Sequence, residues 1–308
     1  MSQTSITILD GGMGRELAKR GAPFRQPEWS ALAMIEAPDM VQQVHQAFIE
    51  AGSQVITTNS YALVPFHIGE QRFIEQGLEL VQRSGEVARQ AVEQAQSTCA
   101  VAGSIPPLFG SYRADLFCAE QVETVATPII RGLAEYVDLW LLETQSLIEE
   151  TQSVTQLIQQ LSAEQKPIWV SFTLEDAEPT AEPCLRSGET VQAAVKAMFG
   201  LGIEAILFNC CQPEIIEAAL QVAQAELAAH PEQSIRLGAY ANAFPPQPKD
   251  ATANDGLDEL REDLSPSAYL GWAEKWQAQG ASLIGGCCGI GPEHIAALAA
   301  HFSAPTSA

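Results

Sequence analysis

The feature of this chain that most constrains its fold is a regular alternation of two kinds of segment. Short apolar runs, many of them rich in β-branched residues, are each followed by a polar or glycine-containing turn and then by a longer stretch with helical spacing. The expected strands are Ile6–Leu9, Gln54–Thr58, Cys99–Gly103, Asp138–Leu142, Ile168–Thr173, Ala205–Phe208, Ile235–Tyr240 and Ser282–Ile284. The expected helices are Asp39–Ala51, Glu75–Ala95, Glu120–Ala134, Thr151–Leu161, Val191–Phe199, Pro213–Ala228, Ser267–Gln279 and Pro292–Phe302. This alternation predicts a parallel sheet whose strands are joined by helices.

Eight strand–helix units in 308 residues close most naturally into a single-domain (β/α)₈ TIM barrel that spans residues 1–308. The alternative is a doubly wound open sheet, which would need a glycine fingerprint after its first strand. Residues 10–14, Asp-Gly-Gly-Met-Gly, lack the G-x-G-x-x-G spacing of that fingerprint. Two segments, at about 11–38 and 241–266, are longer than ordinary connections. Because both follow strands, we expect them to be long loops on the catalytic side of the barrel.

The acidic composition excludes several classes of partner. The chain has 16 Lys and Arg residues against 38 Asp and Glu residues, a formal net charge of −22. Nucleic acids and anionic membrane surfaces both require clustered basic residues, so we expect small-molecule substrates instead. With neither a signal peptide nor a membrane-spanning stretch in view, we expect a cytoplasmic protein whose seven cysteines are reduced. The sequence does not specify an oligomeric state.

Polar residues with chemical potential follow the predicted strands. They are Asp10, Thr58-Asn59, Ser104, Glu143-Thr144, Asn209-Cys210-Cys211, Asn242 and Cys287-Cys288. In a barrel these positions converge on the face where catalysis takes place. Glu143 directly follows the apolar run at 139–142, where an unpaired charge would be costly. A capping or structural role for this acid is the alternative.

Cysteine pairs provide the strongest local signal. The last predicted strand ends in Gly285–Gly289, Gly-Gly-Cys-Cys-Gly, whose glycines leave room for both thiols to turn toward one point. A vicinal redox pair or two buried thiols are the alternatives. Because Cys210 and Cys211 follow the sixth strand, near the eighth, a third thiolate is available for a catalytic zinc with one open position. Counting residues does not decide between Cys210 and Cys211. None of the five histidines has a partner at metal-ligand spacing, so we expect them to be solvated or structural.

Four motifs follow predicted strands, at residues 10–14, 143–144, 209–210 and 285–289. In this order they resemble the homocysteine S-methyltransferase family of zinc-dependent thiol methyltransferases. The resemblance extends from about Ile6 to about Phe302. It implies that zinc is the cofactor and that its ligands are Cys210, Cys287 and Cys288, which leaves Cys211 as a packed thiol.

The resemblance also implies residues that bind the acceptor. It places Asp10, Gly11 and Glu143 around the amino-acid end of homocysteine, where a carboxylate suits an ammonium group and a glycine turn suits a carboxylate. Asn209, next to the ligand cysteine, is a further candidate for substrate binding. Glu143 is also the candidate catalytic residue, since it could take the thiol proton.

The implied reaction is methyl transfer from a small sulfonium donor, S-methylmethionine or S-adenosylmethionine, to the zinc-bound thiolate of homocysteine, giving methionine. Aromatic side chains suit a cationic donor, and four candidates lie in strand-following loops: Trp29, Tyr61, Phe109 and Tyr112. Another thiol acceptor, or a betaine or protein-carried methyl donor, is the alternative, although Thr144 stands where betaine-using relatives have an aromatic residue. A non-enzymatic alternative is a barrel with a structural zinc that binds a partner.

Overall fold

An eight-stranded parallel sheet forms the centre of the molecule. The computed structural model describes residues 5–177, 182–249, 251 and 259–302. Within them, the strands are hydrogen-bonded in the order β1-β8-β7-β6-β5-β4-β3-β2. They are β1 (Thr7–Ile8), β2 (Val55–Thr57), β3 (Ala100–Ile105), β4 (Leu139–Gln145), β5 (Ile168–Phe172), β6 (Ile203–Asn209), β7 (Arg236–Tyr240) and β8 (Ala281–Ile284).

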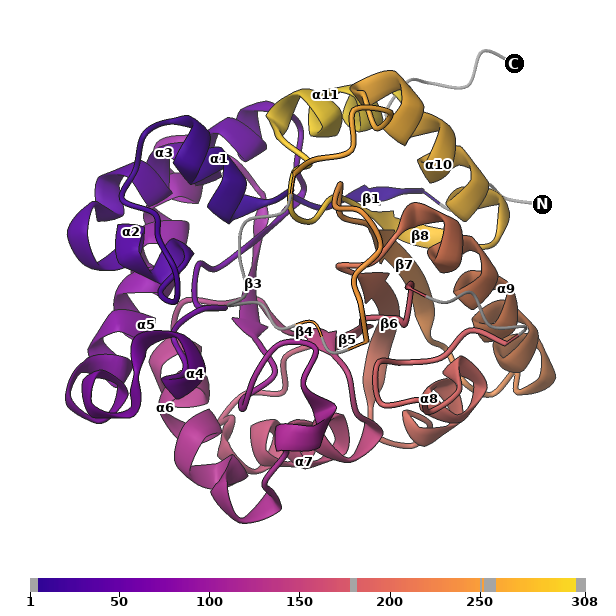
Figure 1. Cartoon of the computed structure of the whole chain (residues 1–308), viewed down its shortest axis with the longest axis horizontal. Coiled ribbons are helices and arrows are strands. Elements are labelled where there is room, and N and C mark those ends of the chain that lie inside the picture. The colour runs from indigo at the N-terminus through magenta and orange to yellow at the C-terminus, as the bar shows by residue number, and fades with distance from the viewer. Residues whose placement is uncertain (1–4, 178–181, 250, 252–258, 303–308) are drawn as a thin grey trace.

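The two outer strands of that order close the ring. Leu9, just beyond β1, forms a parallel bridge with Val55 of β2, and the backbone N–H of Gln54 donates to the carbonyl oxygen of Ile8 at 2.7 Å. The view in Figure 1 looks down the resulting barrel, with the strands inside a ring of helices. The (β/α)₈ barrel predicted from the sequence is therefore confirmed, and the open-sheet alternative is wrong.

Helices cover the outside of the barrel. The described α-helices are α1 (Met13–Lys19), α2 (Ser30–Glu36), α3 (Pro38–Glu50), α4 (Pro65–Ile68), α5 (Glu70–Gln94), α6 (Val122–Leu133), α7 (Ile148–Leu161), α8 (Val191–Ala197), α9 (Pro213–Ala229), α10 (Pro266–Ala278) and α11 (Pro292–Phe302), with 3₁₀ turns at Ala114–Leu116 and Ala119–Gln121. Several begin with proline, whose fixed φ and missing N–H suit a first helical turn. None of the described helices is long and apolar enough to cross a membrane.

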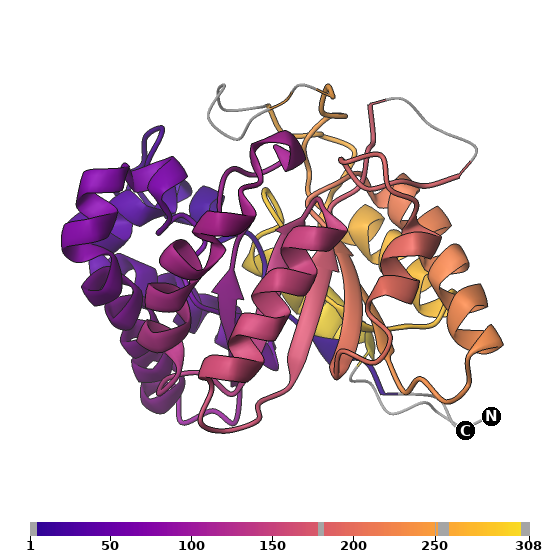
Figure 2. The same ribbon diagram turned by 90° about the horizontal axis from the view of Figure 1, so that it is seen from below.

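The long connections differ in part from expectation. Residues 11–38, expected as a loop, contain the short helices α1 and α2. Of the expected loop 241–266, residue 250 and residues 252–258 lie outside the described residues, and the described part has neither helix nor strand before α10. In Figure 2 the described segments that follow β3, β5 and β7 rise together at one end of the barrel.

The interior of the barrel consists of an apolar layer below a polar one. The apolar layer includes Leu139 and Leu141 of β4 and Ala205 and Leu207 of β6. Because strand side chains alternate between faces, the next inward position on each of these strands is polar, namely Glu143 and Asn209. We call Ser104, Glu143, Ser171 and Asn209 the polar layer, and hydrogen bonds connect Ser104 to Glu143 and Ser171 to Asn209.

Candidate active site

A pocket opens at the carboxyl ends of the strands, above the polar layer. Its described lining brings together all the candidate site residues: Asp10, Gly11, Glu143, Asn209, Cys210, Cys287 and Cys288. They come from four separate strand ends, so the barrel closure assembles the site. The position is the one at which (β/α)₈ barrels carry their active sites.

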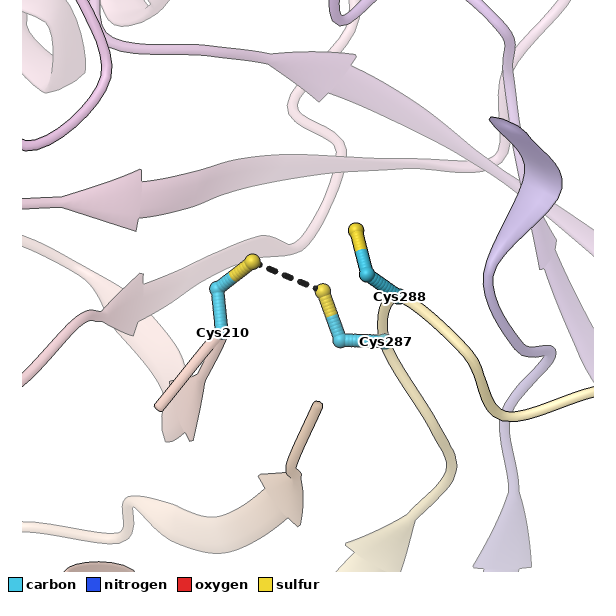
Figure 3. A group of neighbouring side chains, drawn as sticks. All are labelled: Cys210, Cys287 and Cys288. Carbon is cyan, nitrogen blue, oxygen red and sulfur yellow. Dashed lines mark hydrogen bonds between the residues drawn. The ribbon is translucent and has the colours of Figure 1, made fainter. Parts of the chain in front are cut away.

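Three sulfur atoms converge on one side of this pocket. Cys210 follows β6, while Cys287 and Cys288 follow β8, and Figure 3 shows the side chains of Cys210 and Cys287 pointing toward each other, with the Cys288 sulfur nearby. The Sγ atoms of Cys210 and Cys287 are 2.9 Å apart, and all three lie within 4.8 Å of one another. Cys211 points elsewhere, into the fully buried apolar core. Of the two cysteines that the sequence left open, the geometry therefore brings Cys210 to the pair.

The donor set fits a soft metal ion. Tetrahedral zinc with Zn–S bonds of about 2.3 Å would separate its sulfur ligands by about 3.8 Å, which is within the spread of these three atoms. Hydrogen bonds from Cys210 and Cys287 lower the pKa of the Cys288 thiol, while those with Cys210 and Cys288 raise the pKa of Cys287. A thiolate, rather than a thiol, is the form that binds a metal.

Glycines before the cysteine pair are required by close packing. A Cβ on Gly286 would come within 2.2 Å of Cγ2 of Ile290, and a Cβ on Gly285 within 2.5 Å of Cβ of Leu9. Gly289 has a φ of +85°, which disfavours other residues. The Gly-Gly-Cys-Cys-Gly sequence therefore folds into a turn held against the first strand, from which both thiols reach the pocket.

Glu143 is half-buried, and two hydroxyl groups donate to its carboxyl group. The Ser104 hydroxyl donates to its Oε2 at 2.5 Å, and the Tyr240 hydroxyl donates to its Oε1 at 3.2 Å. Burial raises the pKa of Glu143 to about 7, against the lowering effect of these two hydrogen bonds. The group can therefore exchange a proton near neutral pH, or receive a cation that offsets the cost of its burial.

Asp10, the second carboxyl group of the pocket, is buried. Its Oδ2 accepts from the backbone N–H of Thr57 at 2.7 Å, and its Oδ1 accepts from the Thr57 hydroxyl at 3.1 Å. Burial, and more weakly the charge of Glu143, raise the pKa of Asp10 to about 8. Two acids that disfavour each other's ionisation would both be stabilised by one positive group between them.

Asn209 lines the pocket, but scaffold contacts engage both ends of its amide group. Its Oδ1 accepts from the Thr144 backbone N–H at 3.1 Å and from the Ser171 hydroxyl at 2.7 Å. Its Nδ2 donates to the Thr144 hydroxyl at 3.0 Å. Thr144 has a φ of +55°, which is rare for a β-branched residue, and Asn209 holds it there. The amide thus fixes the backbone directly after Glu143.

The aromatic candidates divide into two groups. Trp29, Tyr61 and Tyr112 line the pocket, whereas Phe109 packs against Phe117 with ring centroids 5.9 Å apart. Phe244, which the sequence reasoning did not single out, also lines the pocket. The pocket therefore combines π faces with two acids, which suits a cationic ligand.

Gly11 also lies in the pocket wall, where a Cβ would come within 2.3 Å of the carbonyl oxygen of Ile290. The next backbone N–H, that of Gly12, donates to the same carbonyl oxygen at 2.9 Å. Only glycine fits at position 11, so the main chain itself forms this part of the wall.

Sequence reasoning missed several side chains of the site. Thr57 and Tyr240 hold the two carboxyl groups, and His67 lies in the pocket wall with its Nδ1 3.0 Å from the carbonyl oxygen of Pro27. His67 is buried, so it is structural rather than solvated. Strand alternation could have found Tyr240, which lies two residues after Gly238 on the inward face. Thr57 depends on the pairing of separate strands, and no local signal reports it.

Known proteins resemble this chain over almost its whole length. A family profile described as Homocysteine S-methyltransferase matches residues 7–302. Homocysteine S-methyltransferase of Escherichia coli is 31% identical, over 97% of this chain and 96% of its own. Selenocysteine Se-methyltransferase of Brassica oleracea var. italica is 26% identical, over 94% of this chain and 87% of its own. The crystal structure of the metallated form of the homocysteine methyltransferase MmuM from Escherichia coli superposes with a TM-score of 0.75 at 30% identity, covering 96% of each chain.

Proposed function

Because this chain belongs to the homocysteine S-methyltransferase family and is thereby an S-methyltransferase with homocysteine as acceptor, we propose that it uses zinc and a small sulfonium donor. The donor we propose is S-methylmethionine or S-adenosylmethionine, and the product is methionine. The observation that carries the proposal is the convergence of three cysteine sulfurs within 4.8 Å of one another in a pocket that also holds two acids, Asp10 and Glu143. The need for reduced thiols suits a cytoplasmic location.

Cys210, Cys287 and Cys288 would hold the zinc. All-sulfur coordination favours zinc over magnesium or calcium, and three protein ligands leave a fourth position open. When bound there, zinc would keep the acceptor sulfur in its nucleophilic thiolate form at neutral pH. The metallated state of the related MmuM structure supports a metal in this fold.

Asp10 and Glu143 would bind the ammonium group of homocysteine. Asp10 is buried and Glu143 half-buried, and their burial raises the pKa of each carboxyl group, to about 8 and about 7 respectively. An ammonium group between them would favour both carboxylates in their ionised form and would gain charge-assisted hydrogen bonds. Glu143 would also accept the proton that the acceptor thiol loses on entering the site. Gly11 would let the main chain approach the substrate closely.

The lining favours a positively charged methyl donor. No lysine or arginine is among the described residues that line the pocket, whereas Trp29, Tyr61 and Tyr112 offer aromatic faces. A sulfonium group placed against such faces is stabilised electrostatically. The barrel mouth would then align the methyl group with the acceptor sulfur for in-line transfer.

The test is a donor screen with metal analysis. Purified reduced protein is incubated with homocysteine and, separately, S-methylmethionine, S-adenosylmethionine and betaine, and methionine formation is followed by mass spectrometry. We expect methionine from a sulfonium donor and one zinc per chain in the wild type, and neither in Cys288→Ala. A wild type that stays metal-free with zinc available, or that uses betaine alone, would contradict the proposal.

One of the relatives indicates selenocysteine as a second acceptor. The Brassica relative is named for selenocysteine, whose selenol is also a soft nucleophile on an amino-acid backbone. Competition between homocysteine and selenocysteine for one donor measures the preference as a ratio of kcat/KM values. We expect homocysteine to be preferred.

A further inference from the structure

A buried ion pair lies next to the turn that carries Cys210 and has no role in the function proposed above. Asp176 and Arg186 both belong to the segment between β5 and α8. Nη2 of Arg186 is 3.0 Å from Oδ1 of Asp176, and both side chains are only 1% exposed. Burying two charges is expensive, and a buried pair is weak evidence for stability.

The pair joins loops from three different strands. Oδ2 of Asp176 accepts from the backbone N–H of Gln212, after β6, and Oδ1 accepts from the backbone N–H of Gln247, after β7, each at 3.1 Å. Nη1 of Arg186 donates to the carbonyl oxygens of Gln247 at 3.2 Å and Pro248 at 3.0 Å. Gln212 is two residues from the metal-ligand candidate Cys210. The carboxylate therefore anchors the turn that presents this thiol.

A fourth loop is connected through an aromatic ring. The guanidinium carbon of Arg186 is 4.9 Å from the ring centroid of Tyr112, in the segment after β3. The Tyr112 hydroxyl makes a long contact of 3.5 Å to the carbonyl oxygen of Cys210, which also accepts from the Thr173 hydroxyl at 3.3 Å. The turn is thus held on both sides of Cys211.

The turn needs such support because its backbone is strained. Cys210 has a φ of +55°, in the left-handed region that residues with a Cβ rarely adopt. Such conformations persist where the surrounding structure fixes them. Released from its contacts, the turn would relax and the Cys210 sulfur would move away from Cys287 and Cys288.

We propose that the Asp176–Arg186 pair is a positioning device that holds Cys210 in the geometry required for metal binding. Neither residue is catalytic, because both act through the turn at 210–212 and through Tyr112. This inference rests on the proposed function, since it assumes that the three cysteines bind zinc. It adds to that proposal the residues that keep the site preorganised.

The experiment measures zinc release from full-length protein to a chromophoric chelator. The double variant Asp176→Asn/Arg186→Gln removes both charges together, so that neither is left buried alone. We expect zinc release roughly ten- to hundredfold faster than from wild type, the range typical for residues that support metal ligands. The single variant Arg186→Lys, with Asp176 unchanged, keeps the charge but loses the planar contacts. Its rate of zinc release should therefore lie between those of the wild type and the double variant.

Controls separate positioning from general destabilisation. Val154→Ala, in the buried face of α7, lowers stability without touching the site, and its zinc release should match wild type. Tyr112→Leu removes the ring above Arg186 and the hydroxyl near Cys210, so it tests the same support if the double variant fails to fold. Release at the wild-type rate from the double variant and from Tyr112→Leu would overturn the inference alone. Zinc release from Val154→Ala that is as fast as release from the double variant would also overturn the inference. A wild type that retains no zinc would overturn the proposed function and this inference with it.

Discussion

Replacing Glu143 with glutamine should stabilise the metal-free, ligand-free protein at alkaline pH and impair catalysis. Burial raises the pKa of this carboxyl group from its ordinary 4.5 to about 7. An acid with a raised folded-state pKa favours folding while it is protonated. The contribution of Glu143 to the unfolding free energy is therefore fully present below pH 4.5 and is lost as the pH rises through 7. The difference between the two pKa values corresponds to about 3 kcal/mol of unfolding free energy lost by pH 8. Glutamine cannot ionise and avoids this loss.

The assay compares urea unfolding of the wild type and Glu143→Gln between pH 4 and pH 8, with reductant and chelator present. The variant should be about equal to the wild type at pH 4 and more stable by up to about 3 kcal/mol at pH 8. With zinc and substrates, its kcat/KM should fall by roughly ten- to hundredfold, because a charged hydrogen bond to the substrate ammonium is lost.

Glu150 provides a matched control. It is buried in α7, accepts from the backbone N–H of Leu108 at 2.7 Å, and burial raises its pKa to about 7 as well, but it does not line the pocket. Glu150→Gln should therefore show the same pH-dependent gain in stability with unchanged kcat/KM. A stability difference for Glu143→Gln that stays constant from pH 4 to pH 8 would refute the reasoning about burial. An unchanged kcat/KM would refute the role in substrate binding.

Three further predictions concern the site. Asn209→Ala removes three hydrogen bonds, so it should lower the unfolding free energy by about 3 kcal/mol, measured by calorimetry. It should also lower kcat, measured by steady-state kinetics, because Thr144 is released. Gly286→Ala should abolish zinc binding, since its Cβ would lie 2.2 Å from Cγ2 of Ile290, and the double variant with Ile290→Ala should regain part of the metal measured by mass spectrometry. Trp29→Leu should raise the KM for a sulfonium donor about tenfold and leave the KM for homocysteine within about twofold, the loss of one partly desolvated cation–π contact.

The fold could be predicted because its signal is repeated along the whole chain. Each strand has its own apolar run, and most helices have their own helical spacing of apolar residues. The boundaries of β5, β7 and β8 are within one residue of expectation. Strand β4 is longer than its apolar run predicts. Its apolar run ends at Leu142, yet the strand continues to Gln145, because Glu143 finds partners inside the barrel. Helices α1 and α2 lie in a segment that contains several glycines and prolines, which is typical of a loop.

The candidate site could be predicted where a polar residue or a cysteine directly follows a predicted strand, as at Asp10, Glu143 and Asn209. Cys287 and Cys288 stand out because they are adjacent thiols between glycines. The choice of Cys210 over Cys211 depends on a backbone with positive φ, which turns one thiol inward and the other into the core. Thr57 and Arg186 act through the register and packing of separate strand ends, which no local pattern encodes.

The charges of the pocket explain why the site would favour cationic ligands. Asp10 is buried and Glu143 is half-buried, and the described lining offers no lysine or arginine to pair with them. Their ionisation therefore opposes folding until a cation enters, and whatever cation binds recovers that free energy. In the proposed function, zinc, the ammonium group of homocysteine and a sulfonium donor would each bring positive charge to the pocket. If the proposed function holds, ligand binding should raise the thermal midpoint more at pH 8 than at pH 6, because more of the carboxyl groups are ionised there before the ligand arrives.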